Sequence, residues 1–371
     1  EGPGYWGYAT RYTAYGLGSL QTALTGQTYG LTEIKGLSEA GYFPVYTTGP
    51  TGYYLNFADS RFKSVRQPMA SMFWLASTYN NFDFSNDEHR LLQNYNADPE
   101  HVIWYLPPQK ESGELPLHKF FESEVQLLTL RNGWNPEASF IGIKAGYNQV
   151  NHGHLDLGNF EFDALGKRWA IDLGSDNYNL PGYWDNLPGG KRWEIYRLGS
   201  KSHNVITIND KNQYAAAESH FLEYNLNNNE PYGIVDLTST YPEITESLHR
   251  GVKLMNNGTT LILQDEVVLK DTAAITWGMT TEASILIDHH SALLQIDDKK
   301  LDATILSPEH AVFIVESAEQ QPPEKANTGI QRLVIYIPKT TGETIVVEFT
   351  PHDGKQKIKT KSAEIKKLSD W

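Results

Sequence analysis

Two histidines separated by one residue stand near the middle of the chain, in the stretch Asn-His-Gly-His-Leu-Asp-Leu-Gly-Asn-Phe-Glu-Phe that begins at residue 151. On an extended chain, side chains two residues apart point to the same side, so the spacing predicts that His152 and His154 project together from a strand. Two imidazoles and one carboxylate suit zinc, and Asp172 and His203 follow in later apolar stretches. We therefore predict a zinc site made by His154, Asp172 and His203, with His152 beside it as an acid or base. By spacing alone, the pair is more typical of surface or hydrogen-bonded core histidines than of a metal site.

The stretch from residue 151 to residue 204 resembles the heparinase II/III family of polysaccharide lyases, which includes oligoalginate lyases. The resemblance is carried by Asn-His-Gly-His-Leu-Asp-Leu-Gly-Asn-Phe from residue 151, Ala-Ile-Asp-Leu-Gly from residue 170 and Ser-His-Asn-Val from residue 202. The opening Glu-Gly-Pro-Gly-Tyr-Trp-Gly-Tyr is similar to the family's segment that enters a late helix of an α/α toroid. The resemblance implies that His152 is catalytic and that His154, Asp172 and His203 bind zinc.

The resemblance also implies a reaction, which is the cleavage of a uronic-acid polysaccharide by β-elimination. A base removes the C5 proton beside the carboxylate and the O4 glycosidic bond leaves, so the site must neutralise the carboxylate and protonate the leaving oxygen. Tyrosine and histidine suit these proton transfers. In the family a tyrosine comes from the opening segment, here Tyr5 or Tyr8. We slightly favour Tyr8, because an aromatic residue two places before it resembles the oligoalginate-lyase form. The zinc is then structural, and it orients His152.

Four residues are predicted to contact the substrate: Arg192, Arg197, Tyr183 and Trp184. The two arginines stand in a basic stretch, 191–201, that could meet a carboxylate or a sulfate, although a solvated charged loop explains the same pattern. Aromatic rings suit carbohydrate grooves because their faces meet the C–H faces of sugars. The predicted partner is therefore an acidic polysaccharide or oligosaccharide.

Two departures from the family pattern bear on activity and substrate. Family members carry an Asn or His upstream of the opening segment, thought to neutralise the uronate carboxylate, whereas the chain begins at Glu1. We expect a fragment or a processed chain, whose activity alone is uncertain. Alginate-type members have a tyrosine soon after a Gly-Gly, whereas the Gly-Gly at 189–190 is followed by Lys-Arg-Trp. This difference favours a heparin or heparan sulfate-type glycosaminoglycan as the substrate.

Three alternatives to this function stay open. The first is an oligoalginate lyase, and the second is a non-catalytic, zinc-containing carbohydrate-binding module that lacks a complete active site. The third is a zinc hydrolase with Asp156 as the general base, which no helical His-Glu-x-x-His signature supports.

The composition limits the classes of partner and the compartment. The 371 residues carry a formal net charge of −14, which argues against a nucleic-acid partner because binding to phosphates needs a basic face. No apolar run approaches the roughly twenty residues that span a bilayer, so we expect no membrane insertion. The absence of cysteine excludes disulfides and thiolate metal ligands. We expect a bacterial periplasmic or secreted protein, and we leave a homodimer open.

Hydrophobic spacing divides the chain into a helical part, 1–115, and a strand-rich part, 116–371, which could divide again near residue 270. Apolar steps of three and four residues predict helices over 5–24, 69–79, 87–95 and 99–106. Alternating or short apolar runs predict strands over 118–131, 138–146, 158–164, 168–173, 203–208, 254–269, 274–279, 285–296, 311–316, 331–337 and 343–349. The predicted fold class is α+β multidomain: the C-terminal part of an α/α toroid followed by antiparallel β-sandwich sheets.

Overall fold

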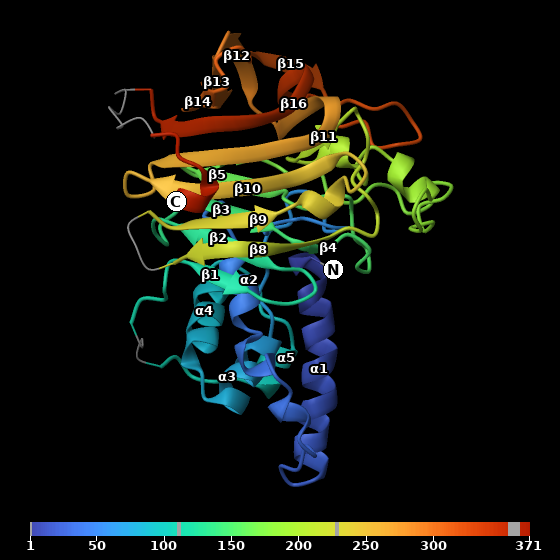
Figure 1. Ribbon diagram of the computed structural model, residues 1–371. Coiled ribbons are helices and arrows are strands. Elements are labelled where there is room, and N and C mark those ends of the chain that lie inside the picture. The colour runs from blue at the N-terminus through green and yellow to red at the C-terminus, as the bar shows by residue number, and fades with distance from the viewer. Residues whose placement is uncertain (1, 110–112, 227–229, 355–363) are drawn as a thin grey trace.

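The helices and strands of the protein are segregated along the chain and in space. The computed structural model describes residues 2–109, 113–226, 230–354 and 364–371. In Figure 1 the helices lie together below the sheets, with the N-terminus of α1 at the junction of the two parts. The predicted α+β class is confirmed. Among the described residues, the α-helices lack the length and apolar character that a bilayer crossing requires.

The N-terminal part is helical, as the periodicity predicts. Its helices are α1 (Pro3–Ala23), α2 (Tyr42–Tyr46), α3 (Ser71–Tyr79), α4 (Phe82–Leu92) and α5 (Glu100–Ile103). Pro3 occupies the first turn of α1, where its missing N–H has no intrahelical acceptor to lose. Leu17 of α1 and Trp74 of α3 belong to one buried cluster, which holds the helices side by side. Short 3₁₀ helices lie at η1 (Leu31–Glu33), η2 (Leu37–Glu39), η3 (Lys191–Glu194), η4 (Ser200–Ser202), η5 (Thr238–Thr240) and η6 (Leu368–Asp370).

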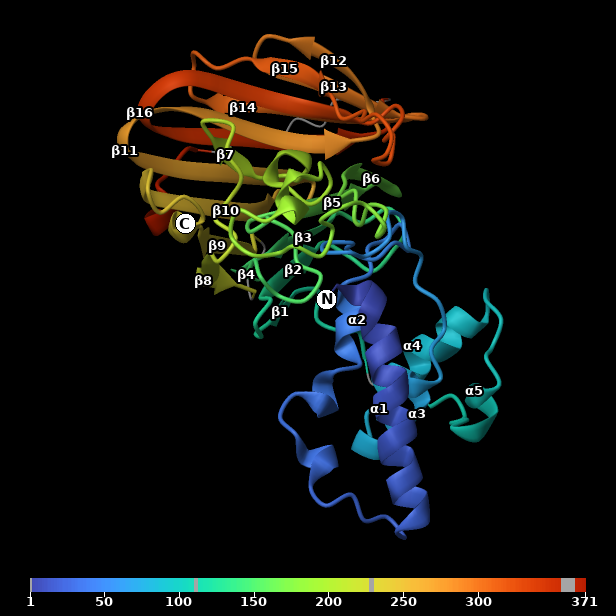
Figure 2. The same cartoon turned by 90° about the vertical axis from the view of Figure 1, so that its right-hand side faces the viewer.

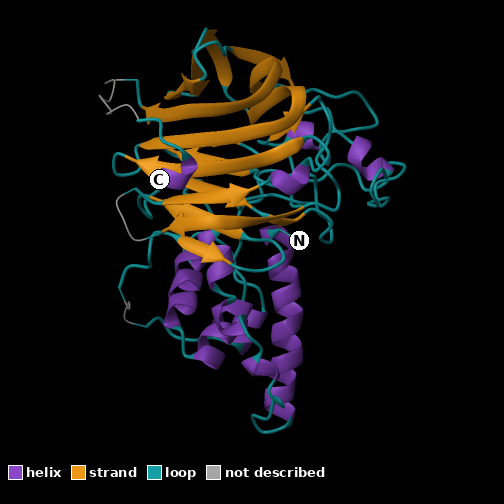
Figure 3. Ribbon diagram, in the orientation of Figure 1, coloured by secondary structure: helices purple, strands orange, loops and turns teal. Residues whose placement is uncertain are grey.

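The C-terminal part contains two antiparallel sheets, which Figure 2 shows from a second direction and Figure 3 colours as strands. The five-stranded sheet has the order β1-β2-β3-β5-β6, with bounds β1 (Lys119–Phe121), β2 (Leu127–Arg131), β3 (Phe140–Lys144), β5 (Phe160–Ala164) and β6 (Lys167–Ala170). The eleven-stranded sheet has the order β12-β13-β14-β16-β11-β10-β9-β8-β4, with β15 beside β16 and β7 beside β11. Its strands are β4 (Gly146–Tyr147), β7 (Ile206–Ile208), β8 (Glu218–Asn225), β9 (Tyr232–Asp236), β10 (Thr245–Met255), β11 (Thr260–Thr281), β12 (Ser284–Asp288), β13 (Ser291–Ile296), β14 (Lys299–Ser307), β15 (Phe313–Ser317) and β16 (Gln331–His352).

Three predicted strands, 118–131, 254–269 and 285–296, each cover parts of two separate strands. The strand predicted over 254–269 is instead the end of β10, a turn, and the start of β11, because Asn256, Asn257 and Gly258 adopt the positive φ angles of a tight turn. The possible division near residue 270 falls within β11. The neighbours of β11 change there: its pairing with β10 ends at Leu269, its pairing with β7 begins at Ile275, and its pairing with β16 shifts between Val268 and Ala273.

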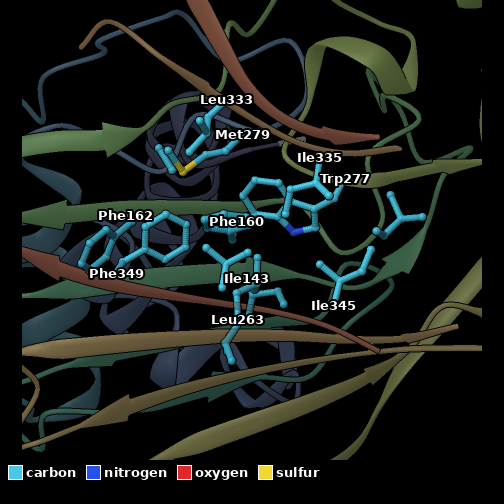
Figure 4. Close-up of a cluster of buried hydrophobic side chains, with 14 of the residues drawn as sticks. Ile143, Phe160, Phe162, Leu263, Trp277, Met279, Leu333, Ile335, Ile345 and Phe349 are labelled. Atoms are coloured by element: carbon cyan, nitrogen blue, oxygen red, sulfur yellow. The ribbon is translucent and has the colours of Figure 1, made fainter. Parts of the chain in front are cut away.

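Side chains from the inner faces of both sheets form one continuous core. Ile143 and Phe160 come from the smaller sheet, while Leu263, Trp277 and Phe349 come from the larger one, and all five belong to the same buried cluster (Figure 4). Truncating a fully buried aromatic ring of this kind to alanine typically costs about 3–5 kcal/mol. The sandwich is therefore a rigid base from which the loops after β4 and β6 extend toward the start of α1.

Candidate active site and metal centre

The three predicted metal ligands converge. His154 lies in the loop between β4 and β5, Asp172 follows β6, and His203 follows η4. One ligand atom from each residue lies within 4.8 Å of those of the other two, and all three side chains are fully buried. The two imidazole rings have centroids 5.3 Å apart. The chain therefore brings together, from three separate segments, a donor set that could hold a metal ion.

The hydrogen bonds around these ligands fit a metal. His154 Nδ1 and His203 Nε2 are buried and have no hydrogen-bond partner in the described part of the chain, which is costly for a polar atom unless something else binds it. The other nitrogen of each ring contacts a carboxylate: His154 Nε2 lies 3.0 Å from Asp59 and His203 Nδ1 lies 2.8 Å from Asp172. Burial lowers the pKa of His154 and so favours the neutral imidazole that binds metals. Two nitrogens and one carboxylate suit zinc.

The histidine pair does not lie on a strand, which corrects the expectation drawn from its spacing. The segment around His152 and His154 is a loop, and His152 itself has a φ of 59°, in the left-handed region. The two rings nevertheless reach one group. His152 Nδ1 lies 2.7 Å from Oδ2 of Asp59, and His154 Nε2 lies 3.0 Å from Oδ1 of the same carboxylate.

Asp59 is the residue of this site that sequence reasoning missed. It is fully buried, and besides the two histidines it accepts hydrogen bonds from the Tyr183 hydroxyl at 2.5 Å and from Arg192 at 3.2 Å. Burial alone would raise the pKa of Asp59, but the hydrogen bond from His154 and the charge of Arg192 outweigh it and hold the pKa well below its ordinary value. Asp59 is therefore a carboxylate at neutral pH.

The start of α1 brings Tyr5, rather than Tyr8, to His152. The Tyr5 ring stacks on the imidazole, with centroids 5.0 Å apart and planes inclined by 23°, and its hydroxyl lies 2.6 Å from that of Tyr178. Tyr8 is 67% exposed, and its ring lies tilted against that of Tyr12 at a centroid distance of 4.9 Å. The ring contact with His152 is therefore made by Tyr5, whereas the slight preference from the motif was for Tyr8.

Close backbone packing explains how α1 is brought to this place. A Cβ built on Gly2 would come 2.5 Å from the carbonyl oxygen of Phe57, so only glycine allows this approach. On the other side of the same loop, Gly174 has a φ of +61°, and a Cβ there would meet the carbonyl oxygen of Ser60 at 1.9 Å. The segment that carries Asp59 is thus held between the N-terminus of α1 and the loop that carries Asp172.

The two predicted substrate-binding arginines are internal, which corrects their assignment. Arg192 is 2% exposed and donates to the carbonyl oxygens of Gly153 and Tyr183 as well as to Asp59. Arg197 is also buried, and it donates to the carbonyl oxygens of Leu173 and Ser175 and to the side chain of Asn327. Their guanidinium N–H groups donate to backbone and side-chain oxygens of the surrounding loops, so neither side chain is positioned to contact a substrate.

The two predicted aromatic contacts differ from each other. Tyr183 is fully buried, and its hydroxyl is committed to Asp59. Trp184 is 57% exposed, and its ring stands edge-on to His152 at a centroid distance of 5.5 Å. Tyr178 completes the aromatic wall at 5.1 Å from Trp184. Trp184 is thus the exposed member of this aromatic wall beside His152.

Asp156, the base of the hydrolase alternative, is committed to another partner. It is fully buried and forms an ion pair with the ammonium group of Lys144, which is itself buried. The geometry therefore brings Tyr5 and His152 into contact beside a buried group that could hold a metal, while Asp156 is paired with Lys144.

The chain is similar to a known protein family and to solved structures. The family described as "Heparinase II/III-like, C-terminal" matches residues 129–361. The structure of the heparan sulfate lyase HepC from Pedobacter heparinus is similar at a TM-score of 0.71 and 16% identity, covering 96% of this chain and 53% of that one. A structure titled heparinase III has a TM-score of 0.67 at 14% identity, with coverages of 95% and 53%.

At these identities the solved structures show a common fold, and the chain spans about half of their length. The comparison with curated proteins found no match. The family match covers more than half of the 371 residues and includes the metal-site motifs at 154, 172 and 203. The predicted family is confirmed: the chain belongs to the heparinase II/III-like proteins and contains their C-terminal domain.

Proposed function

We propose that this chain forms part of a polysaccharide lyase that cleaves a uronic-acid polysaccharide by β-elimination. The observation that carries the proposal is the contact between Tyr5 and His152, whose rings stack at 5.0 Å although they come from the helical part and from a loop of the sandwich. Both are groups that exchange protons, and a β-elimination needs two proton transfers at neighbouring atoms of the same sugar pair.

The chemical steps can be assigned to this pair. One of the two side chains takes the C5 proton, the electron pair forms the C4–C5 double bond as the C4–O4 bond breaks, and the other side chain gives a proton to O4. The Tyr178 hydroxyl, 2.6 Å from that of Tyr5, can stabilise a charge that develops on Tyr5 during the transfer. Trp184 would position the sugar ring by stacking.

A zinc ion held by His154, Asp172 and His203 would supply a structural charge centre that ties three loop segments together. The side chains of the protein position the catalytic imidazole. Asp59 contacts both His154 and His152, so the metal-side loop and the catalytic imidazole share one carboxylate. Fixed neighbours of this kind set the position of a ring.

A heparin or heparan sulfate-type glycosaminoglycan is the favoured substrate. The heparan sulfate lyase among the solved structures supports this choice by analogy of fold. An oligoalginate substrate stays the alternative, and so does a binding module without catalysis. A periplasmic or secreted location also stays a prediction.

The test is to incubate the longest natural form of the protein with heparan sulfate, chondroitin sulfate and alginate, and to follow the ultraviolet absorbance of the unsaturated uronate product. We expect product from heparan sulfate, and none from the His152→Ala variant, which should keep its fold and its metal because His152 is not a proposed ligand. Product formation by His152→Ala at the wild-type rate would contradict the mechanism. A wild-type protein that binds these polymers and leaves all of them uncut would support the binding module instead.

A further inference from the structure

We propose that Asp59 is a positioning residue that fixes which nitrogen carries the hydrogen on both His152 and His154, and so couples the metal centre to the catalytic imidazole. The catalytic half of this inference rests on the proposed function, whereas the half that concerns the metal ligand does not. Asp59 comes from a loop of the helical part, 93 and 95 residues before the two histidines.

The argument begins with the chemistry of the acceptor. An ionised carboxylate accepts hydrogen bonds and donates none, and Asp59 is paired with Arg192, whose guanidinium is always charged. Each ring nitrogen that contacts Asp59 must therefore carry the hydrogen. For His152 this is Nδ1, which leaves Nε2 as the nitrogen that takes or gives the proton in neutral imidazole chemistry.

For His154 the same reasoning gives the opposite tautomer. Its Nε2 contacts Asp59 and must carry the hydrogen, so Nδ1 presents the lone pair. His154 Nδ1 is also the buried atom that has no hydrogen-bond partner among the described residues and that belongs to the candidate metal group. Two independent features, the carboxylate on one side of the ring and the unpartnered nitrogen on the other, therefore agree on one tautomer.

Both oxygens of Asp59 are needed. Oδ2 accepts from His152, while Oδ1 accepts from His154, Tyr183 and Arg192. An asparagine has the same shape but only one acceptor oxygen, so its NH₂ group would face one of the two imidazoles as a donor. That ring would have to change its tautomer or lose the hydrogen bond.

The carboxylate is also held at a fixed distance from the metal ligands. The neighbouring Arg61 forms a β-bridge with Gly174, and the carbonyl oxygen of Ser60 accepts a hydrogen bond from the Ser175 backbone at 3.3 Å. These contacts join the Asp59 loop directly to the segment that carries Asp172. Asp59 is thus placed to transmit the geometry of the metal side to His152.

The test compares Asp59→Asn with Asp176→Asn in the longest natural form of the protein. Asp176 is a matched control, because it is a buried carboxylate on the neighbouring loop and contacts neither histidine, its partners being Arg197 and the backbone amides of residues 177 and 325. We expect Asp59→Asn to lose about 10- to 100-fold in zinc affinity, measured by competition with a chelator, because a partner of a metal-bound histidine typically has this effect. Its kcat should fall by a similar factor with little change in KM, and Asp176→Asn should stay near the wild type in both.

A direct measurement needs no variant of Asp59. Nitrogen-15 NMR of the wild-type histidines, assigned with His152→Ala, should show His152 protonated at Nδ1 and His154 at Nε2. The opposite tautomer at either ring, or a zinc affinity of Asp59→Asn equal to that of the wild type, would overturn the inference. If the wild type cut no uronate polymer, the proposed function would fail, while the tautomers and the zinc affinity would still decide the role of Asp59.

Discussion

Arg192 offers a sharp test of the difference between a substrate contact and an internal support. We expect Arg192→Met to destabilise the fold and to lower kcat. The guanidinium donates to the Gly153 carbonyl oxygen at 3.0 and 3.2 Å, to the Tyr183 carbonyl oxygen at 2.9 Å and to Asp59 at 3.2 Å. Gly153 stands between the two histidines of the site, so the change should also release their loop.

The size of the effect follows from the burial of this network. Removing one partner of a buried ion pair typically costs about 3–5 kcal/mol, because the remaining charge is left without compensation. Methionine keeps part of the packing of the arginine stem, so we expect the lower part of this range, about 3–4 kcal/mol. With an unfolding entropy of about 2.1 cal/mol/K per residue, a chain of this length that unfolds as one unit would lose about 4–5 °C in Tm.

Thermal and denaturant unfolding measure this loss, and the neighbouring Lys191→Met is the matched control. Lys191 is exposed, and substitutions at such positions usually change stability by less than about 0.5 kcal/mol. If Arg192→Met kept the wild-type Tm and only raised KM for the polysaccharide, Arg192 would contact the substrate after all. The internal role derived from its hydrogen bonds would then be wrong.

Three further predictions concern the metal, the pH dependence of stability and the boundary between the parts. The wild type should bind about one zinc ion per chain, and His203→Ala should lose this zinc and have a lower Tm. Metal analysis and calorimetry measure the two effects. Full zinc occupancy in the variant would exclude this ligand set. Burial and the charge of Arg131 lower the pKa of His118 to about 4. Between pH 6.5 and 4 the unfolded chain therefore binds a proton at this residue that the folded chain does not. The free energy of unfolding should then fall as the pH falls through this window. The loss of unfolding free energy should be about 1–3 kcal/mol, because the His118 ring is partly exposed. His118→Asn should reduce this loss. An unchanged slope of stability against pH in the variant would show that His118 is not its cause. A protein that begins near Leu117 should give a circular dichroism spectrum of strand with little helix, and a dominant helical signal would contradict a boundary near residue 115.

The parts of the fold that were predictable are those in which one local pattern decides the structure. The expected helix over 5–24 agrees with α1 (Pro3–Ala23) because its apolar side is regular and Pro3 marks the start. β8, β9 and β14 were missed. The burial of β8 alternates poorly, with most of its residues partly or fully exposed, so no period of two appears in its sequence.

The metal group was predictable because residue types decide it, whereas the support around it was not. His154, Asp172 and His203 can be recognised one by one in their motifs. Asp59 stands in a loop without a motif, and only tertiary packing brings it to both histidines. Arg192 was misjudged for the same reason, since a charged residue in a basic stretch gives no sign that its partners are buried carbonyl oxygens.

The choice between Tyr5 and Tyr8 could not be made from the motif, because the two residues lie within one turn of the same helix. Three residues along an α-helix turn a side chain through about 300°, which leaves the two tyrosines only about 60° apart on one side of α1, so their place in the sequence does not separate them. The contact that separates them depends on how the start of α1 packs against the loop at Phe57.

The most direct test of the account compares Tyr5→Phe with Tyr8→Phe in the longest natural form of the protein, with heparan sulfate as the substrate. Each change removes one hydroxyl from α1 and keeps the ring. Because Tyr5 stacks on His152, whereas Tyr8 is 67% exposed and contacts Tyr12, Tyr5→Phe should abolish the unsaturated product while Tyr8→Phe keeps most of the wild-type rate. Both variants should keep the wild-type Tm and zinc content. A fully active Tyr5→Phe enzyme would contradict the central claim that Tyr5 and His152 carry out the elimination.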